Sequence, residues 1–332
     1  MDLQVLRMKS VLFIYRNQNL AQAFVKHFRL NNYNVYEFYD EPISYFKFNL
    51  FQKIENLVYK KVFKDNKHLH EINERNFINH TNRSLKKLKR LNLKFDYCFV
   101  IRGDLIPENA LKYAQDISGK MVDYQLDGIK VSQKILDYYY LFDKVFVFDE
   151  SDVANYPEYN FTAITNCYFE DKIQEEKIID FYYTGAYLPD RFENLKEIIN
   201  YSGTEFNYKI LLGAFRNMES PKEIEIITEP ITYEENLQYA KRAKILLDFK
   251  REEHDGLSLR FFEAMNYNCK VITNNHSVKN YDFYNPDNIF ITDFINFDGL
   301  EEFIKKRYQS IPSDIKSKYE FKSWISNILE DA

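Results

Sequence analysis

The sequence predicts an α/β protein built from two doubly wound, Rossmann-like domains that face each other across a central cleft. Short apolar runs that indicate buried strands alternate with stretches of helical period, and this alternation occurs twice along the 332 residues. The runs are apolar at successive positions rather than at every second one, which is typical of parallel strands covered by helices on both faces. A chain of this length can form two domains with buried cores.

The first series opens with a strand predicted at residues 10–15 (SVLFIY), a helix at 20–30 and a strand at 34–39, which together begin a βαβ unit. The first strand is a continuous apolar run, and the stretch at residues 20–30 has the period of a helix. Further strands of this series are predicted at residues 97–101, 120–124, 144–148 and 162–166.

The second series repeats this pattern from residue 180 onward. Its predicted strands are residues 180–184, 208–212, 245–249 and 270–273, and its predicted helices are residues 191–201, 233–242 and 259–267. A polar stretch at residues 170–176 separates the two series. We therefore expect one domain at residues 1–172 and a second at residues 173–332, with the last helix packing back on the first domain.

Composition narrows the class of function. The chain carries 45 Lys and Arg against 50 Asp and Glu, a net charge of −5, whereas a general nucleic-acid binder needs a clearly basic surface. The three widely spaced cysteines, Cys98, Cys167 and Cys269, form neither a disulfide framework nor a Cys-x-x-Cys metal site. No apolar run is long enough for a signal sequence or a membrane span. We expect a cytoplasmic protein that binds no nucleic acid.

Between the strands predicted at residues 34–39 and 97–101 lies a stretch rich in helix formers, with a basic cluster and a leucine stripe. The basic residues are Arg83, Lys86, Lys87, Lys89, Arg90 and Lys94, and the leucines are Leu85, Leu88 and Leu91. The interpretation we favour is a solvated helix face whose leucines pack inward. The alternative is a patch that contacts anionic lipid headgroups and holds the protein peripherally at the inner membrane.

Glycine is scarce, and its spacing argues against several nucleotide and hydrolase motifs. Neither G-x-G-x-x-G nor G-x-x-x-x-G-K-[ST] occurs, which disfavours a dinucleotide dehydrogenase and a P-loop NTPase. Gly256, in GLSLR, lacks the second glycine of a nucleophile elbow. His68, His70 and Glu71 are a weak metal candidate, and we favour surface histidines as their interpretation.

Three glycines follow predicted strands, where open α/β sheets place their ligand-binding loops. They are Gly103 in IRGD, Gly185 in YTGAY and Gly256 in HDGLSLR. The third is the most informative, because a helix is predicted directly after it and the exposed first amides of a helix bind anions.

The loop formed by Gly256, Leu257 and Ser258 is therefore a candidate phosphate site. Arg260 lies in the first turn of the following helix, and Glu263 lies about one turn further, within reach of a sugar hydroxyl beside the phosphate. The alternative is an ordinary capped helix with both of these side chains in solvent.

Longer segments of the chain resemble a known family. Residues 255–275 (DGLSLRFFEAMNYNCKVITNN), followed by residues 281–289 (YDFYNPDNI), resemble the donor-site region of bacterial GT-B glycosyltransferases. The resemblance is closest to the CgeB-like members and to those of lipopolysaccharide or capsule biosynthesis. Residues 181–191 (FYYTGAYLPDR) share it, as do the N-terminal segments DYCFVIRGD, DYQLD and FDKVFVFDESD, so it covers most of the chain.

The resemblance implies a GT-B fold, with a nucleotide-sugar donor bound mainly by the second domain and an acceptor bound mainly by the first. Glu263 matches the family glutamate that binds the nucleotide ribose. Asp255 stands at the place of the first acid in the E-x7-E motif of related retaining enzymes, although it is Asp rather than Glu. By the same resemblance, Gly185 lets the backbone approach the donor and Arg191 reaches the diphosphate.

The chemistry of sugar transfer identifies the groups that such a site needs. Positive charge develops at the anomeric carbon and negative charge on the departing diphosphate, so the protein has to stabilise the leaving group and orient the acceptor hydroxyl. The sequence contains no Asp-x-Asp, the usual metal-diphosphate signature of the other large glycosyltransferase fold. We expect helix amides with Arg260, Lys250 or Arg191 to do this without a metal, and we expect no cofactor besides the nucleotide-sugar co-substrate.

The remaining candidates are polar residues at the ends of predicted strands. Asp104 and Asp127 of the first domain are candidate bases for the acceptor hydroxyl, and each could instead cap a helix or close a turn. Asn274 and Asn275 follow the last strand of the second series, where their amides could bond sugar or phosphate. A plain turn is an equal alternative for them.

These features predict a glycosyltransferase that moves a hexose-like sugar from a nucleotide diphosphate to a surface glycan of the lipopolysaccharide or capsule type. Its acceptor would be a glycan or a lipid-linked glycan. Two alternatives remain open: a nucleotide-sugar epimerase on the same scaffold, and a catalytically inactive bilobal protein that binds sugar nucleotides.

Overall fold

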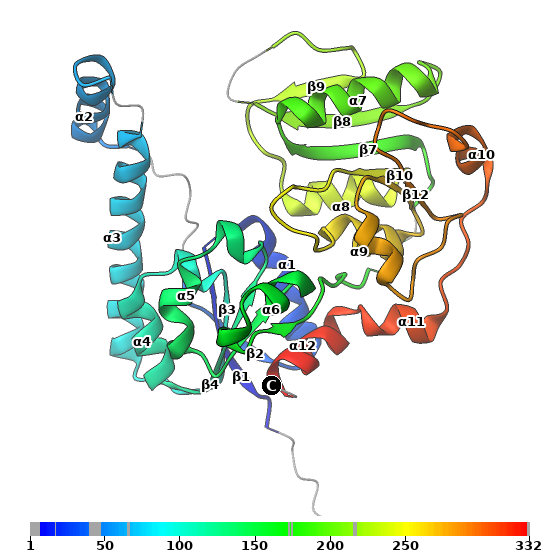
Figure 1. The fold of residues 1–332 in the computed structure, drawn as a ribbon. Helices are drawn as coiled ribbons and strands as arrows, with labels where there is room; N and C mark the ends of the chain where they lie inside the picture. Colours follow the sequence, from blue (N-terminus) through cyan, green and yellow to red (C-terminus); the bar gives the residue numbers. More distant parts are fainter. Residues whose placement is uncertain are drawn as a thin grey trace, which may run out of the picture. The chain divides into compact units, whose positions relative to one another are not determined.

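The computed structural model describes residues 7–16, 18–39, 48–64, 67–171, 173, 175–214 and 218–330. Its contacts divide the chain into two compact units, with the boundary between Phe146 and Val147. The strands form two six-stranded sheets whose strands alternate with helices along the chain, which confirms the predicted α/β class (Figure 1).

The first sheet has the strand order β2-β1-β3-β4-β5-β6. Its strands are β1 (Ser10–Tyr15), β2 (Asn34–Glu37), β3 (Phe95–Ile101), β4 (Ser118–Gln125), β5 (Lys144–Val147) and β6 (Thr162–Ala163). β1 pairs in parallel with β2 on one side and with β3 on the other, and β3 pairs in parallel with β4. The order of strand addition therefore reverses between β1 and β3, which makes this a topological switch point.

The second sheet has the order β12-β11-β10-β7-β8-β9, and its neighbouring strands are all parallel. Its strands are β7 (Ile179–Ala186), β8 (Tyr208–Gly213), β9 (Ile224–Ile227), β10 (Ala243–Asp248), β11 (Lys270–Thr273) and β12 (Ile289–Ile291). Counted from β7, this is the 3-2-1-4-5-6 order of the Rossmann fold. Its switch point lies between β7 and β10.

The helices before β7 are α1 (Gln18–Leu30), α2 (Leu50–Lys61), α3 (His68–Leu91), α4 (Glu108–Asp116), α5 (Ile135–Tyr138) and α6 (Glu150–Asn155). The helices after it are α7 (Pro189–Ser202), α8 (Tyr233–Lys241), α9 (Leu259–Tyr267), α10 (Leu300–Lys305), α11 (Ser313–Lys318) and α12 (Phe321–Leu329). None of the described helices combines the length and the apolar character needed to cross a lipid bilayer.

The packing of β7 explains why its sequence is apolar at successive positions. Phe181 and Tyr183 lie on the face covered by α7 and α10, whereas Tyr182 lies on the opposite face with α8 and α9. Because helices cover both faces of the second sheet, a position on either face is removed from water and is filled by an apolar or aromatic side chain.

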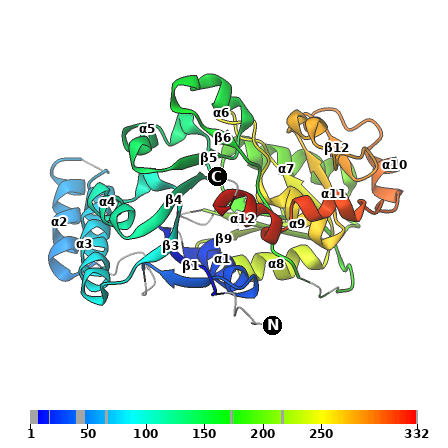
Figure 2. The same ribbon diagram turned by 90° about the horizontal axis from the view of Figure 1, so that it is seen from below.

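The basic cluster predicted in the first half lies on α3, except for Lys94, which follows the helix. Helix α3 runs beside α2 at the edge of the first unit (Figures 1 and 2). Leu85 and Leu88 are buried and the basic residues are exposed, as the favoured interpretation requires, but Leu91 is 46% exposed. The expectation of surface histidines is wrong for His68. Its side chain is buried because the ring stacks on Tyr59.

Candidate functional site

The candidate site lies at the switch point of the second sheet, at the carboxyl ends of β7 and β10. β7 ends in Thr184, Gly185 and Ala186, and β10 ends in Asp248. Arg260, in the first turn of α9, joins the two strands. Its Nη2 donates a hydrogen bond to the carbonyl oxygen of Thr184, and its Nη1 lies 3.7 Å from Oδ1 of Asp248. Polar groups from three elements therefore meet where the Rossmann fold binds its ligands.

The side chain of the N-cap residue of α9 does not cap the helix. Ser258, the N-cap residue, has an extended backbone, but its Oγ donates to Oδ1 of Asp248 at 2.6 Å and accepts no helix amide. Thr273 Oγ1 donates to the other carboxylate oxygen of Asp248 at 2.8 Å. Within the described residues, no acceptor is found for the amides of Leu259 and Arg260. A helix start with free amides attracts an anion.

Helix α8 of the same unit shows the usual arrangement. The amide of Glu235 donates to Oγ1 of Thr232 at 3.1 Å, and the amide of Thr232 donates to the Glu235 carboxylate at 2.8 Å. The reciprocal bonds of this capping box satisfy the amides of Thr232 and Glu235. The start of α8 thus has the side-chain cap that the start of α9 lacks.

Gly185 and Gly256 both permit close packing within the protein. A Cβ atom at position 185 would overlap the hydroxyl group of Tyr183, and one at position 256 would overlap the ring of Phe148. Neither glycine has a positive φ, so the requirement is for space rather than for an unusual backbone conformation. These packing roles were not predicted from the sequence, and the approach of Gly185 to a donor stays a prediction.

Tyr183 is a residue of this site that the sequence analysis missed. Its side chain is 1% exposed, and the Arg260 guanidinium lies over its ring at 4.8 Å from the centroid. Its hydroxyl group has no hydrogen-bond partner among the described residues. Buried hydroxyls are nearly always bonded, so this one is an exception to the usual pattern. In the sequence, Tyr183 reads only as one aromatic residue of an apolar strand.

Polar contacts hold the loop between β10 and α9. Lys250 forms an ion pair with Asp255, and the backbone amide of Lys250 donates to Oδ1 of Asn274 at 2.7 Å. Asn275 is buried, and its Nδ2 donates to the carbonyl oxygens of Asp255 and Gly256 at 3.2 and 3.3 Å. Both asparagine side chains therefore bind protein groups and shape the loop that leads to the free helix amides.

Leu257 and Arg191 complete the predicted donor-binding set. Leu257 is buried, and its carbonyl oxygen accepts a hydrogen bond from Asn166 at 2.9 Å, which anchors the loop. Arg191 lies in the first turn of α7, directly after the carboxyl end of β7. Its side chain is partly exposed, and no ion pair is found for it within the described residues. Arg191 is thus a cation at the same edge of the sheet as α9.

Glu263 is buried, so the alternative of an ordinary helix with Arg260 and Glu263 in solvent is wrong. Glu263 is 5% exposed, its Oε1 accepts from Nδ2 of Asn236 at 3.1 Å, and the Tyr233 hydroxyl donates to the same carboxylate. Burial raises the pKa of Glu263, and the Arg260 guanidinium and these two donors oppose the shift. The side chain of Arg260 is 24% exposed.

In the first unit, both candidate bases are ion-paired with Arg102, which follows β3 at the switch point of the first sheet. Its Nε and Nη2 donate to the two carboxylate oxygens of Asp104 at 2.7 and 2.8 Å, and its Nη1 pairs with Asp127. The Asp104 side chain is 5% exposed and that of Asp127 is 37% exposed. Asp127 is therefore the more accessible of the two carboxylates.

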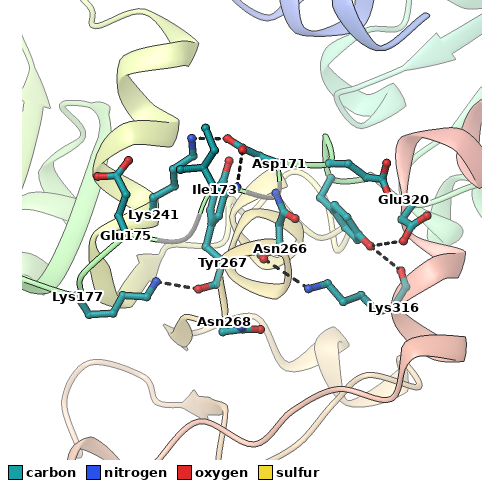
Figure 3. Close-up of a pocket in the computed structure, with 12 residues that line it drawn as sticks. Asp171, Ile173, Glu175, Lys177, Lys241, Asn266, Tyr267, Asn268, Lys316 and Glu320 are labelled. Atoms are coloured by element: carbon teal, nitrogen blue, oxygen red, sulfur yellow. Dashed lines mark hydrogen bonds and ion pairs between the residues drawn. The ribbon is translucent and has the colours of Figure 1, made fainter. Parts of the chain in front are cut away.

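A pocket of about 460 Å³ lies in the second unit at the C-terminal end of α9 (Figure 3). Of its lysines, Lys241 pairs with Asp171, and Lys177 donates to the carbonyl oxygen of Tyr267 at 2.8 Å. The helix end beside it carries carbonyl groups, which disfavour an anion. No residue predicted for the donor site lines this pocket. Within the described residues, no group of three or more His, Cys, Asp or Glu side chains is arranged to hold a metal.

No protein-family model matches the sequence, and no curated protein matches it. Several solved structures are similar over nearly the whole chain. One is an α-glucosyltransferase in complex with UDP and a 13-mer DNA, with a TM-score of 0.54, 10% identity and coverage of 96% of this chain and 94% of that one. Another is an α-glucosyltransferase in complex with UDP-glucose and DNA, with a TM-score of 0.51, 12% identity and coverage of 97% and 95%.

A third similar structure is a putative UDP-N-acetylglucosamine 2-epimerase from Listeria monocytogenes. Its TM-score is 0.51 at 9% identity, with coverage of 98% of both chains. At such low identities, similarity is a statement about the fold and not about the reaction. Together with the two parallel sheets, these comparisons show that the chain has the GT-B fold.

Proposed function

We propose that this protein is a glycosyltransferase that moves a hexose-like sugar from a nucleotide-diphosphate donor to a glycan acceptor. One observation carries the proposal: the start of α9 is uncapped at the switch point of a Rossmann-type sheet, within a GT-B fold. Free helix amides at that position are suited to a diphosphate, the leaving group of this reaction.

In this proposal, the amides of Leu259 and Arg260 hold the diphosphate. Arg191 balances its remaining charge from the same edge of the sheet, and Lys250 does so on leaving its ion pair with Asp255. The two similar α-glucosyltransferase structures, which were determined in complex with UDP and with UDP-glucose, support a nucleotide-sugar donor. Glu263 would bind the ribose by exchanging one of its protein hydrogen bonds for a sugar hydroxyl, and Asp255 would face the donor sugar.

The acceptor would be activated from the first unit, with Asp127 or Asp104 taking the proton of its hydroxyl. The proposed acceptor is a surface glycan of the lipopolysaccharide or capsule type, free or linked to lipid, and the proposed location is the cytoplasm. We further propose that transfer needs no metal, because the helix amides and cations listed above supply the positive charge that a metal would supply. Transfer should then survive an excess of chelator, and its loss would contradict this part of the proposal.

The proposal is tested by measuring nucleotide binding and then transfer. A panel of nucleoside diphosphates and their sugars is screened for a rise in melting temperature, since a ligand that binds the folded state stabilises it. The best ligand is then titrated calorimetrically against the wild type, Glu263→Gln and a control, Glu301→Gln, whose side chain is 75% exposed on α10. We expect about tenfold weaker binding for Glu263→Gln alone. Unchanged binding, or no stabilising nucleotide, would refute the donor site.

A nucleotide-sugar epimerase is a second candidate, favoured by the similarity to the putative epimerase from Listeria monocytogenes. An epimerase needs no acceptor, so incubation of the best nucleotide sugar with the protein alone distinguishes the two. A new sugar nucleotide in the proton NMR spectrum would support epimerisation. Hydrolysis only, or no change until an acceptor is added, would support transfer. Binding without any turnover would support an inactive sugar-nucleotide-binding protein.

A further inference from the structure

The apolar side chains of helix α2 face solvent, whereas in a helix that packs on a core they face the protein. None of its residues is buried. The large apolar side chains at its N-terminus are among the most exposed in the described chain, with Leu50 at 71% and Phe51 at 83%. Ile54, Leu57 and Val58 are 51%, 51% and 40% exposed. At 100° per residue these five positions share one face, an arc of about 140° when Val62 is included.

The polar side chains of α2 are the ones that pack against the protein. Nε2 of Gln52 donates to Oδ1 of Asn76 on α3 at 2.7 Å. Tyr59 stacks on the ring of His68, with centroids 3.5 Å apart, and Glu55 accepts from Nε2 of His68 at 2.9 Å. The arrangement is thus the reverse of the usual one, in which the apolar face packs on the neighbouring helix.

The outward face is also positively charged. Residues 48–64 contain four lysines, Lys53, Lys60, Lys61 and Lys64, and a single acid, Glu55. That acid lies on the face toward α3, where it pairs with His68 and Arg75. On a helical projection Lys53 and Lys60 border one side of the apolar arc, and Lys61 lies within it. Lys64 follows the end of the helix. No carboxylate of residues 48–64 lies on the outward face to neutralise the charge of these lysines.

We propose that the outward face of α2 binds the surface of a lipid bilayer rich in anionic lipids. A helix with an apolar face and flanking lysines lies in the plane of the membrane interface, with its apolar side chains among the acyl chains and its lysines at the headgroups. Figure 1 shows α2 beside the N-terminal half of α3, away from the sheet of the same unit. This site is separate from the basic cluster on α3, and it does not depend on the proposed transfer activity.

The charge of the outward face of α2 favours an anionic lipid bilayer over a second copy of the chain as its binding partner. Pairing of two α2 helices through the same face would bring two sets of three lysines together without an acid on that face. Like charges at a shared interface oppose association, whereas anionic headgroups complement them. A dimer that forms through α2 is therefore an outcome that would overturn the proposal.

Vesicle flotation of the full chain tests the proposal without any nucleotide, so its result is independent of the donor site. The vesicles contain phosphatidylcholine alone or phosphatidylcholine mixed with phosphatidylglycerol. We expect the protein to float only with the mixed vesicles and to be released by high salt. The combined variant Leu50→Ser, Phe51→Ser, Ile54→Ser should bind about a hundredfold more weakly or worse, as should Lys53→Gln, Lys60→Gln, Lys64→Gln.

The matched control is Ile295→Ser, because Ile295 is 85% exposed in the second unit and its loss should leave flotation unchanged. A second control, Lys86→Gln, Lys87→Gln, Arg90→Gln, removes charge from α3. Loss of flotation in this variant but not in the α2 variants would overturn the proposal in favour of the α3 cluster. Equal binding to both vesicle types, or no binding to either, would overturn it outright. Light scattering without vesicles detects an α2-dependent dimer.

Insertion has a direct spectroscopic readout. The single native tryptophan, Trp324, is 2% exposed, so a new tryptophan at position 51 dominates the solvent-sensitive emission. In Phe51→Trp, we expect mixed vesicles to shift the emission to shorter wavelength and brominated lipids to quench it. Emission that stays at its position in water while the protein floats would show that α2 is not the lipid-binding element.

Discussion

The Oγ atom of Ser258 lies 2.6 Å from Oδ1 of Asp248, so the residue that begins α9 bonds the preceding strand instead of its own helix. A serine cap would stabilise the helix by about 1 kcal/mol, and the structure forgoes that stabilisation at the switch point of the sheet. A local departure from the usual rule, at the place where the fold binds ligands, is typical of a functional site.

The free amides can be removed without removing the helix. Leu259 is the first residue of α9, and Ser258 before it already has the extended backbone (φ −66°, ψ 162°) that a following proline requires. Leu259→Pro should therefore keep α9 and delete one amide donor. We expect nucleoside-diphosphate affinity to fall about tenfold, the value of one hydrogen bond to a charged group, as measured by calorimetric titration. Ser313→Pro, at the first position of α11, is the control. Equal affinity of Leu259→Pro and the wild type would argue against an anion at this helix start.

Substitutions at Gly185 and Tyr183 should have non-additive effects on the free energy of unfolding. In Gly185→Ala the new methyl group meets the Tyr183 hydroxyl, so we expect a loss of about 1–3 kcal/mol in the free energy of unfolding by urea. Tyr183→Phe removes an unpartnered buried hydroxyl and should cost little or stabilise the fold. The double variant should recover part of the loss. Additive effects of the two substitutions would show that the contact is not the cause.

Tyr183→Phe also separates folding from ligand binding. If a ligand bonds the Tyr183 hydroxyl at the switch point, affinity for the nucleotide sugar should fall several-fold while stability without ligand is unchanged or higher. Calorimetric titration and urea unfolding of the same preparation give both quantities. A variant with full affinity would place the ligand away from Tyr183.

The two acids paired with Arg102 should respond differently to neutral substitution. Asp127 is 37% exposed, so Asp127→Asn should keep the fold and, if Asp127 is the acceptor base, lower kcat by about 10²–10⁴ with unchanged donor affinity. Asp104 is buried in a two-bond pair, so Asp104→Asn should mainly lower stability, by about 3 kcal/mol. Transfer kinetics and urea unfolding of both variants check this. Wild-type kcat in Asp127→Asn would exclude it as the base.

Much of the fold could be predicted from the sequence because covered parallel strands leave a strong pattern. The strands at residues 10–15 and 270–273 and the helix at residues 259–267 have the predicted bounds. β9 and β12 were missed, since IEII and IFI are short and carry too little periodicity to stand out from a loop. Pattern also cannot give strand order, which depends on how the helices cross over the sheet.

The candidate site was predictable in position but not in its contacts. The glycines and polar residues after strands lie at one edge of the second sheet, because carboxyl ends of parallel strands share one edge, and their role there stays a prediction. The diversion of Ser258 to Asp248 depends on two residues ten positions apart that meet only in the fold. Local capping rules predict instead that the Ser258 side chain accepts a hydrogen bond from an amide in the first turn of α9. The exposed apolar face of α2 was missed for a related reason: amphipathic period gives no sign of which face packs.

Asp123 in the first unit should make stability depend on pH. It is fully buried between the amide of Gly103, which donates to Oδ1 at 2.8 Å, and Nε2 of Gln125, which donates to Oδ2 at 2.6 Å. Burial raises the pKa of Asp123 from 3.8 to about 8. Between these values the folded protein binds a proton at this carboxyl that the unfolded chain has released. The contribution of Asp123 is thus fully present below about pH 4 and is lost as the pH rises toward 8.

Asp123→Asn should remove this dependence. The asparagine can accept from Gly103, and a half-turn of the Gln125 amide would present its otherwise unpartnered Oε1 to the new NH₂ group. The difference in unfolding free energy, variant minus wild type, should therefore rise with pH by up to about 1.4 kcal/mol per unit. Urea unfolding across this range measures it. Asp96→Asn should behave oppositely, because hydrogen bonds from Ser10 lower the pKa of Asp96 and its contribution is lost as the pH falls. A flat difference for Asp123→Asn would mean that the buried carboxylate stays charged.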